Sequence, residues 1–422
     1  MNRTQLADGV HLTVFPAEKF KRCRVTVRFL WPNRRESATA EALLALLMER
    51  SYADCPDMTQ LSKQLAALYG AALSVDISTL GANRVLCVSV SGIQDEYALA
   101  GEALSAEYAA MALGVAFRPY LVDGEFDAQD VAIEKEQLRE QLESEINDKR
   151  SYCLWQARRR FYGDTPEGVE RYGYLDEVDA LTPAAVTKAW RHMISTAQME
   201  VMVLGANEQA VRESVLCSLA KLNRAPAQLA APHAMPRTQP QVDTEAFDTA
   251  QGKLCLMFTA GAPVQKEDVI ALNVAVALLG GTPTSRLFVN VREKRSLCYY
   301  CAVSGSARNG MLYIDSGVEH ANAAAAREAV LAELALLKDG PITQQELDET
   351  KRSYACGLAC AEDTLSGIEG WYFAEICRGG TMTPQEAIDA VNAVTAQEIR
   401  DVLRRFSLSV EYLLTKEGSA HA

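Results

Sequence analysis

The feature that most constrains the fold is an internal repeat spaced by about half of the chain. Residues 175–182 (LDEVDALT) are matched by residues 388–395 (IDAVNAVT), at an offset of 213 positions. Each stretch ends in a threonine, Thr182 or Thr395, that precedes an amphipathic run and then a β-like apolar run, so both are candidate helix N-caps. A second match relates residues 126–138 to 342–354 at an offset of 216. Two matches at nearly one offset predict a duplicated domain.

A proline-rich connector lies between the two copies. It contains prolines at positions 226, 232, 236 and 240, and such a density disfavours both helix and central strand. A chain of 422 residues is also long enough for two domains of about 200 residues. The boundaries we expect are an N-terminal domain over 1–222, a linker over 223–244 and a C-terminal domain over 245–422.

Strand-like and helix-like segments alternate within each half. Short apolar runs such as "RVLCVSVSG" and "KLCLMFTA" predict strands, and the charged stretches around 125–160 and 343–378 predict long helices. The fold class predicted is therefore α+β. We expect two homologous halves, each an antiparallel-rich mixed sheet with helices packed on one face, and the halves facing each other in the manner of a clam shell.

Composition excludes several classes of function. The net charge of −13 and pI of about 5.1 disfavour a nucleic-acid partner. There is no signal-peptide pattern and no apolar run of membrane-spanning length, which indicates a cytoplasmic protein without a membrane partner. Eleven cysteines then indicate reduced thiols. Cys298 and Cys301 form a C-x-x-C, but in a strand an odd separation would direct the two sulfurs to opposite faces, which argues against zinc.

Motifs for common catalytic chemistry are missing. The sequence contains no G-x-x-x-x-G-K-[ST], G-x-S-x-G or G-x-G-x-x-G. No two histidines are four residues apart, so neither H-E-x-x-H nor H-x-x-E-H occurs. The five histidines are His11, His192, His233, His320 and His421.

One stretch, "SRLFVNVREKRSLCYY" (285–300), combines cations with an aromatic pair. Locally, Gly280 and Gly281 predict a helix end, after which Thr282 can cap a new helix with Pro283 at its first position. Leu287, Phe288 and Val291 would share the core face of that helix, and a strand would follow from Leu297. The simplest interpretation is a solvated helix face followed by a buried strand.

The same residues resemble a known family. "LLGGTPTSRLFVNVREKRSLCYY" (278–300) is similar to the C-terminal-domain signature of the insulinase/pitrilysin-type (inverzincin) zinc peptidases, roughly G-G-x-x-S-R-L-F-x-x-[LV]-R-E-x-x-[GS]-L-[AC]-Y. The segment 162–190, the duplicated halves and the central linker are also similar, so the resemblance spans nearly the whole chain. It implies that Arg292 and Tyr299 hold a peptide backbone and a developing oxyanion, a task suited to guanidinium and phenol donors.

The resemblance fails where the family binds zinc. The segment "EALLALLMERSYADCP" (41–56) occupies the place of the family's H-x-x-E-H helix, and alignment through Pro56 puts Ala42, Ala45 and Leu46 at the motif positions. The family's third ligand, a glutamate, is replaced by Gln141 in "EKEQLREQ" (134–141). We therefore expect no metal and no cofactor in this chain.

Some members of this family work in pairs, one subunit bearing H-x-x-E-H and the other keeping only the Arg/Tyr pair. The resemblance implies that this chain is such a companion: a non-catalytic subunit, inactive by itself, that supplies Arg292 and Tyr299 in trans to a peptide or unfolded segment at the zinc of its partner. A homodimer could form in isolation. Two alternatives stay open: a non-enzymatic scaffold of the same fold, and a peptide-binding module without a peptidase partner.

Overall fold

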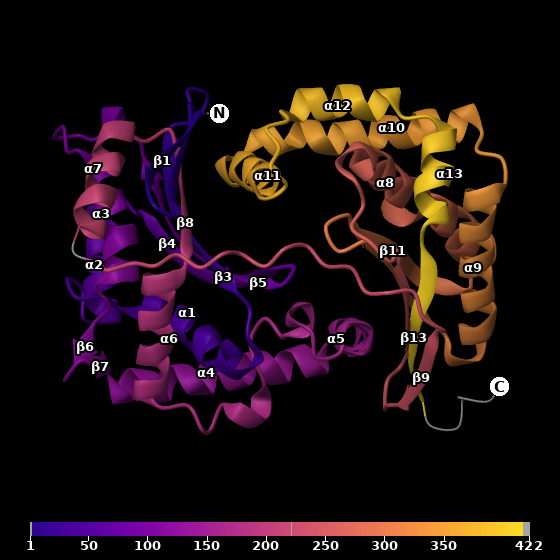
Figure 1. Ribbon diagram of the computed structural model, residues 1–422, viewed down its shortest axis with the longest axis horizontal. Coiled ribbons are helices and arrows are strands. Elements are labelled where there is room, and N and C mark those ends of the chain that lie inside the picture. Colours follow the sequence, from indigo (N-terminus) through magenta and orange to yellow (C-terminus); the bar gives the residue numbers. More distant parts are fainter. Residues whose placement is uncertain (1, 221, 417–422) are drawn as a thin grey trace. The chain divides into compact units, whose positions relative to one another are not determined.

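The computed structural model describes residues 2–220 and 222–416, and these divide into two compact units (Figure 1). The first contains the residues up to Ser144 together with Val169–Ala231. The second contains Glu145–Gly168 and the residues from Pro232 onward. Within the described residues, no helix is long and apolar enough to cross a membrane. His421 lies outside the described part of the chain.

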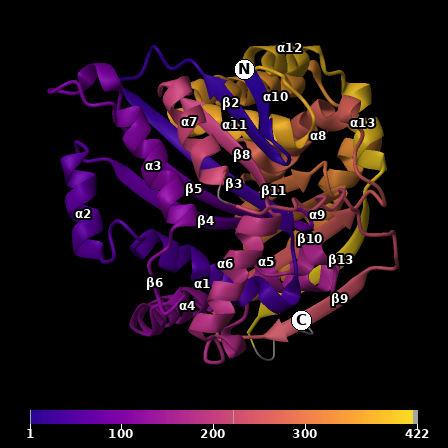
Figure 2. The same cartoon turned by 60° about the vertical axis from the view of Figure 1, so that its left-hand side comes forward.

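The first unit is built on a six-stranded sheet. The pair β2/β8 is parallel and the other neighbours are antiparallel; β3, β5 and β4 run side by side in Figure 2. In sheet order the strands are β1 (Asn2–Ala7), β2 (Val10–Phe15), β8 (Gln198–Leu204), β3 (Arg22–Pro32), β5 (Asn83–Ile93) and β4 (Ala72–Leu80). A separate small hairpin joins β6 (Leu121–Val122) to β7 (Glu125–Phe126).

Helices cover one face of this sheet and close its apolar core. Buried side chains of β3, such as Val25, Val27 and Phe29, belong to the same cluster as buried residues of α1 and α3. The helices are α1 (Ala38–Arg50), α2 (Met58–Ala67), α3 (Leu104–Phe117), most of α4 (Ala128–Asn147), α6 (Pro183–Thr196) and α7 (Glu208–Leu219).

The second unit is built on a five-stranded sheet with one parallel pair, β13/β9. In sheet order the strands are β11 (Cys298–Ser306), β12 (Met311–Val318), β10 (Gly252–Thr259), β13 (Ser407–Thr415) and β9 (Gln241–Ala246). The helical segments are α8 (Val269–Val276), the π-helical η6 (Ala277–Gly281) and η7 (Leu287–Glu293), α9 (Ala323–Asp339), α10 (Gln344–Ala359), α11 (Leu365–Cys377), α12 (Pro384–Ala393), α13 (Ala396–Arg404) and α5 (Lys149–Tyr162).

Both faces of this second sheet are covered. Leu254, Leu256 and Phe258 of β10 face the cluster that includes α8, α9 and α13. The intervening Cys255 and Met257 face α5, which lies on the opposite side of the sheet from α9 (Figure 1). Side chains of an extended strand alternate between the two faces, so a strand that is apolar at every position needs cover on both.

Helix α5 requires a correction of the expected domain boundaries. Residues 145–168 were assigned to the N-terminal domain of 1–222, but they belong to the second unit. Cys153, Ala157 and Phe161 are buried against the second sheet, and Arg150 pairs with Asp315 of β12 at 2.6 Å. Tertiary packing therefore decides the membership of α5, and its position in the sequence does not.

The α+β class with two homologous halves is confirmed. Thr182 caps α6 and Thr395 caps α13 through side-chain hydrogen bonds, as the repeat predicted. The strand after each helix occupies an equivalent place, because β8 lies between β2 and β3 while β13 lies between β9 and β10. In both sheets this inserted strand is parallel to one neighbour and antiparallel to the other.

Candidate functional site

The helix before β11 is the first element of the candidate site, and it departs from its predicted form. The apolar run ends at Gly281 as expected, but the next helix starts after Arg286 and not at Pro283. It is a π-helix in which the amide of Lys294 donates to the carbonyl of Val289 at 3.0 Å. π-Helical turns occur mostly as short insertions, often at functional sites.

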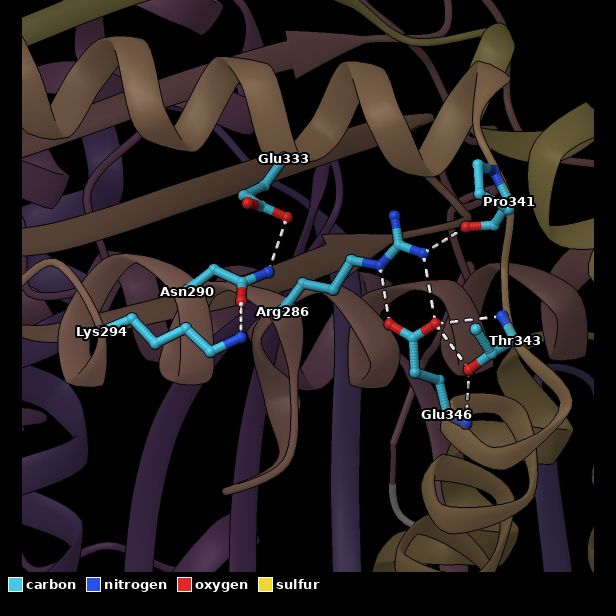
Figure 3. A network of polar contacts seen from close by, with 7 residues as sticks. All are labelled: Arg286, Asn290, Lys294, Glu333, Pro341, Thr343 and Glu346. Carbon is cyan, nitrogen blue, oxygen red and sulfur yellow. Dashed lines mark hydrogen bonds and ion pairs between the residues drawn. The ribbon is translucent and has the colours of Figure 1, made fainter.

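A polar network fixes this helix to the rest of the second unit (Figure 3). Arg286, only 8% exposed, donates to Glu346 Oε1 at 3.1 Å and to the carbonyl of Pro341 at 2.7 Å. One turn later, Asn290 donates to Glu333 Oε2 of α9 at 3.0 Å, and Lys294 donates to Asn290 at 3.1 Å.

Glu346 has a second task at the start of α10. Its carboxylate accepts from the Thr343 amide at 3.0 Å, and its own amide donates to Thr343 Oγ1 at 3.2 Å, which completes a capping box. The guanidinium of Arg286 and the backbone and hydroxyl of Thr343 therefore share one carboxylate (Figure 3). Burial alone would raise the pKa of Glu346, but the hydrogen bonds from Thr343 and Arg286 and the positive charge of Arg286 hold it below its usual range. The carboxylate therefore stays ionised near neutral pH.

Arg292 lies on the same helix with a different environment. Its guanidinium stacks on the ring of Phe288 at 4.6 Å, and its side chain is 40% exposed. The distance from Nε to Glu293 Oε1 is 3.6 Å, too long for a good hydrogen bond. Phe288 was expected on the core face beside Leu287 and Val291, which are fully buried. It is only half-buried and supports Arg292 instead.

Tyr299 stands on a β-bulge at the start of β11. Cys298 pairs with Val318 and Tyr300 with Gly317, so Tyr299 is the extra residue on the β11 side. Its side chain is 50% exposed, and its hydroxyl donates to Glu319 Oε1 at 3.2 Å. This hydrogen bond and the negative charge of Glu319 raise the pKa of Tyr299, which keeps the phenol protonated and able to donate.

The turn between η7 and β11 brings Arg292 and Tyr299 to consecutive elements of one unit. Ser296 takes a positive φ of 50° there, and its amide donates to the carbonyl of Arg292 at 3.1 Å. Leu297 closes the turn through a bond to Val291 at 3.1 Å. The side chains of Arg292 and Tyr299 are therefore exposed, while the helix and strand that carry them are fixed by buried neighbours. The role of the two residues in binding stays a prediction.

The bulge corrects the expectation for the C-x-x-C pair. We expected the sulfurs of Cys298 and Cys301 on opposite faces, yet both belong to the core on the side of α8 and α9, and the Cys301 thiol hydrogen-bonds to Cys298. The extra residue at Tyr299 shifts the alternation by one position. Tyr300 consequently points to the other face, where Arg150 stacks on its ring at 4.5 Å.

The positions that align with the zinc motif lie in the first unit and offer no ligand. Ala42 and Ala45 of α1 are buried in the apolar core, and Leu46 packs against it. Gln141 of α4 is half-buried. Methyl and isobutyl groups in a dry core do not fit a zinc ion, which needs imidazole, thiolate or carboxylate ligands. Among residues 2–220 and 222–416, no three acidic, histidine or cysteine side chains gather in a way that could hold a metal.

Three ion pairs beside these positions, made by Arg84 and Arg50, were missed by the sequence analysis. Arg84 of β5, fully buried, donates from Nε to Glu41 Oε2 at 3.0 Å, while Trp31 donates to Glu41 Oε1 at 3.0 Å. Arg50, at the end of α1, contacts Asp130 at 2.7 Å and Glu134 at 3.1 Å on α4. The signal was present, since a charged residue in the apolar run "NRVLCVSV" needs a buried partner.

Comparison with known proteins shows which protein families this chain resembles. Residues 180–354 match the family described as the peptidase M16 inactive domain. The probable inactive metalloprotease YmfF of Bacillus subtilis is 25% identical over 407 residues, with 96% of each chain covered. A conserved protein of Enterococcus faecalis, solved by crystallography, has 28% identity and a TM-score of 0.90, with 99% of this chain and 98% of that chain covered.

The chain therefore resembles M16-type peptidases, in residues 180–354 by the family match and over nearly its whole length by its relatives. The resemblance to insulinase/pitrilysin-type peptidases is thus confirmed. Two further crystal structures show the same fold: a protease from Helicobacter pylori (15% identity, TM-score 0.82; 98% of this chain and 99% of that chain covered) and a peptidase M16 inactive domain from Pseudomonas fluorescens (17%, 0.78; 98% of each).

The resemblance gives the residues of α1 their interest. Ala42, Ala45 and Leu46, the positions predicted to align with H-x-x-E-H, carry neither a zinc ligand nor a general base. The surroundings of these positions are well ordered, because α1 packs on the sheet and is tied to α4 and β5.

Proposed function

We propose that this M16 homologue is the non-catalytic, substrate-binding subunit of a heterodimeric zinc peptidase. The observation that carries the proposal is a contrast between the two units. The motif positions of α1 are alanine and leucine in a closed core, whereas Arg292 and Tyr299 are exposed donors on an anchored helix and strand. The B. subtilis relative bears the name of an inactive metalloprotease, which supports a non-catalytic role.

The chemistry of the two donors suits a peptide. A guanidinium supported by Phe288 and a phenol kept protonated by Glu319 can both donate to a peptide carbonyl or to an oxyanion. Tyr299 lies on β11, an edge strand of its sheet. Edge strands present unpaired backbone groups, so an extended substrate can add to them with little sequence preference.

The partner in this proposal is a homologous subunit with an intact H-x-x-E-H motif, and the zinc belongs to that partner. The substrate is a peptide or an unfolded segment, and the complex is expected in the cytoplasm. Arg292 and Tyr299 act only on substrate bound at the partner. The chain alone neither binds stoichiometric zinc nor cleaves peptides.

Co-expression with the H-x-x-E-H homologue of the same genome tests the proposal. We expect a stable heterodimer with one zinc per pair and peptidase activity that needs both chains. Stoichiometric zinc in the isolated chain, together with cleavage by it alone, would overturn the proposal.

A scaffold without a role in binding is the second candidate, and one observation favours it. Arg292 and Tyr299 both have partners within the chain, Phe288 and Glu319, so structural roles alone could retain them. Under this alternative, Arg292→Ala and Tyr299→Phe leave the activity of the assembled complex intact.

A further inference from the structure

The Cys298–Cys301 pair forms a dithiol at the base of Tyr299. The bulge at Tyr299 turns both sulfurs to the same face of β11, and the two thiols are joined by a hydrogen bond. Each residue is 8% exposed and no disulfide links them. Two thiols in contact, one on each side of the residue that carries the exposed phenol, are not needed by the proposed function of Arg292 and Tyr299.

The surroundings favour the thiolate form of Cys298 over that of other cysteines. The hydrogen bond from Cys301, the nearby Ser316 hydroxyl and the positive charge of Arg292 lower the pKa of Cys298 to about 7, against the effect of its burial. The bond to Cys298 and burial raise the pKa of Cys301. By contrast, burial and the negative charge of Asp95 raise the pKa of Cys23 to about 12, although backbone hydrogen bonds and Arg22 act in the opposite direction. A thiolate beside a protonated thiol is the arrangement of an attacking and a resolving cysteine.

We propose that Cys298 and Cys301 are a redox-active pair that low-molecular-weight disulfides oxidise reversibly to an intrachain disulfide. The Cys298 thiolate attacks one sulfur of the small disulfide, forms a mixed disulfide and releases one small thiol. Cys301 then loses its proton to solvent, and its thiolate attacks the Cys298 sulfur and displaces the second small thiol. Two protein thiols are oxidised and one small disulfide is reduced to two thiols.

Closure of this disulfide acts on Tyr299. A disulfide needs Cα atoms about 4.4–6.8 Å apart, whereas three steps along an extended strand span about 10 Å. Bond formation therefore fixes the length of the segment between Cys298 and Cys301. Tyr299 lies inside this segment, so oxidation moves its hydroxyl relative to Glu319.

Mass spectrometry of the full chain tests the proposal directly. The protein is equilibrated in glutathione buffers of increasing oxidised fraction, quenched with acid, alkylated with N-ethylmaleimide and digested with trypsin. Cleavage after Arg295 and Arg308 gives a peptide that contains Cys298, Cys301 and no other cysteine. We expect this peptide to lose two hydrogen atoms and to escape alkylation in oxidising buffer, and to regain both alkylations on return to reducing buffer.

Three variants assign the roles. Cys301→Ser should stop at a glutathione adduct on Cys298, and Cys298→Ser should lose the reaction at Cys301. The double variant Cys356→Ser/Cys360→Ser, which removes a separate exposed pair at the C-terminal end of α10, should react as the original chain does. A wild-type peptide that takes two alkylations in every buffer would overturn the proposal, as would a Cys298→Ser variant whose Cys301 reacts at the original rate. The mass readout is independent of peptidase activity, so failure here leaves the proposed function untouched.

Discussion

At the scale of single residues, Tyr299 and Glu319 form a donor and acceptor pair whose state decides what the phenol can bind. The hydroxyl of Tyr299 donates to the Glu319 carboxylate at 3.2 Å in this structure. A substrate carbonyl must compete with that carboxylate, which is the stronger acceptor. Glu319 thus keeps the phenol of Tyr299 protonated, but it also accepts the one hydrogen bond that the phenol can donate.

Glu319→Gln should lower the pKa of Tyr299, because the glutamine removes the negative charge that disfavours the phenolate. A pH titration followed by NMR on tyrosine labelled at Cζ measures the change, and Tyr299→Phe identifies the signal. Glu328→Gln, an exposed carboxylate on α9, is the matched control and should leave the signal in place. A Tyr299 signal that titrates identically with and without Glu319 would contradict the pairing.

Cys298 should show a reactivity that depends on pH near neutrality. Its pKa in the folded chain is lowered from 9.0 to about 7, and the thiolate population increases as the pH rises through this value. Alkylation by iodoacetamide should therefore reach half of its maximal rate near pH 7 rather than near pH 9.0. Arg292→Ala should move the midpoint upward, because it removes a positive charge that favours the thiolate. A midpoint in the native chain at 9.0 or higher would refute the assignment.

At the scale of elements, η7 keeps its position because one carboxylate serves both this helix and α10. Glu346 closes the capping box of α10 and accepts from Arg286. Helices α12 and α13 have capping boxes of the same kind, with Glu386 and Glu398. Comparing the Glu346 box with these two boxes isolates the effect of the Arg286–Glu346 ion pair on stability.

Glu346→Gln should lower the free energy of unfolding by about 1 kcal/mol more than Glu386→Gln does, since only the former removes the charge that pairs with Arg286. Both glutamines can still accept from the cap backbone. Urea unfolding of the two variants measures the difference. Equal destabilisation would show that Arg286 gains nothing from Glu346.

Helix α5 should be required for the stability of the second unit. Phe161→Ala removes a buried ring from the cluster with Met257 and Tyr412, and should cost about 3 kcal/mol or more. Arg159→Ala on the exposed side of the same helix is the control and should cost little. Hydrogen exchange of β10 and β13 amides reports on the sheet itself. Unchanged protection in Phe161→Ala would mean that α5 does not stabilise the sheet.

The elements also differ in how well the sequence predicts them. The repeat gave the two capped helices and the strands after them, because N-caps and apolar periodicity are local signals. The bulge at Tyr299 and the π-helical form of η7 have no such signal, since register and turn geometry are settled by pairing with β12 and by the Arg286 network. Membership of α5 in the second unit depends on a sheet that lies far along the chain.

At the scale of the whole molecule, the two similar units differ in the side chains that they present. In the first, the positions predicted to align with the zinc motif are apolar, and Glu41 and Arg84 form a buried pair beside them. The second keeps the signature residues Arg292 and Tyr299 with exposed side chains. On the proposed function, donors in a chain whose predicted motif positions carry no zinc ligand imply that another chain supplies the metal.

The most direct test is the peptidase rate of the purified heterodimer with changes in this chain only. Arg292→Ala and Tyr299→Phe should each lower the rate about tenfold or more, as the loss of an oxyanion donor does, while zinc content and assembly stay constant. Arg295→Ala, a change of an exposed neighbouring cation, should leave the rate unchanged. Intact complexes of Arg292→Ala and Tyr299→Phe that cleave peptides at the original rate would contradict a role in substrate binding.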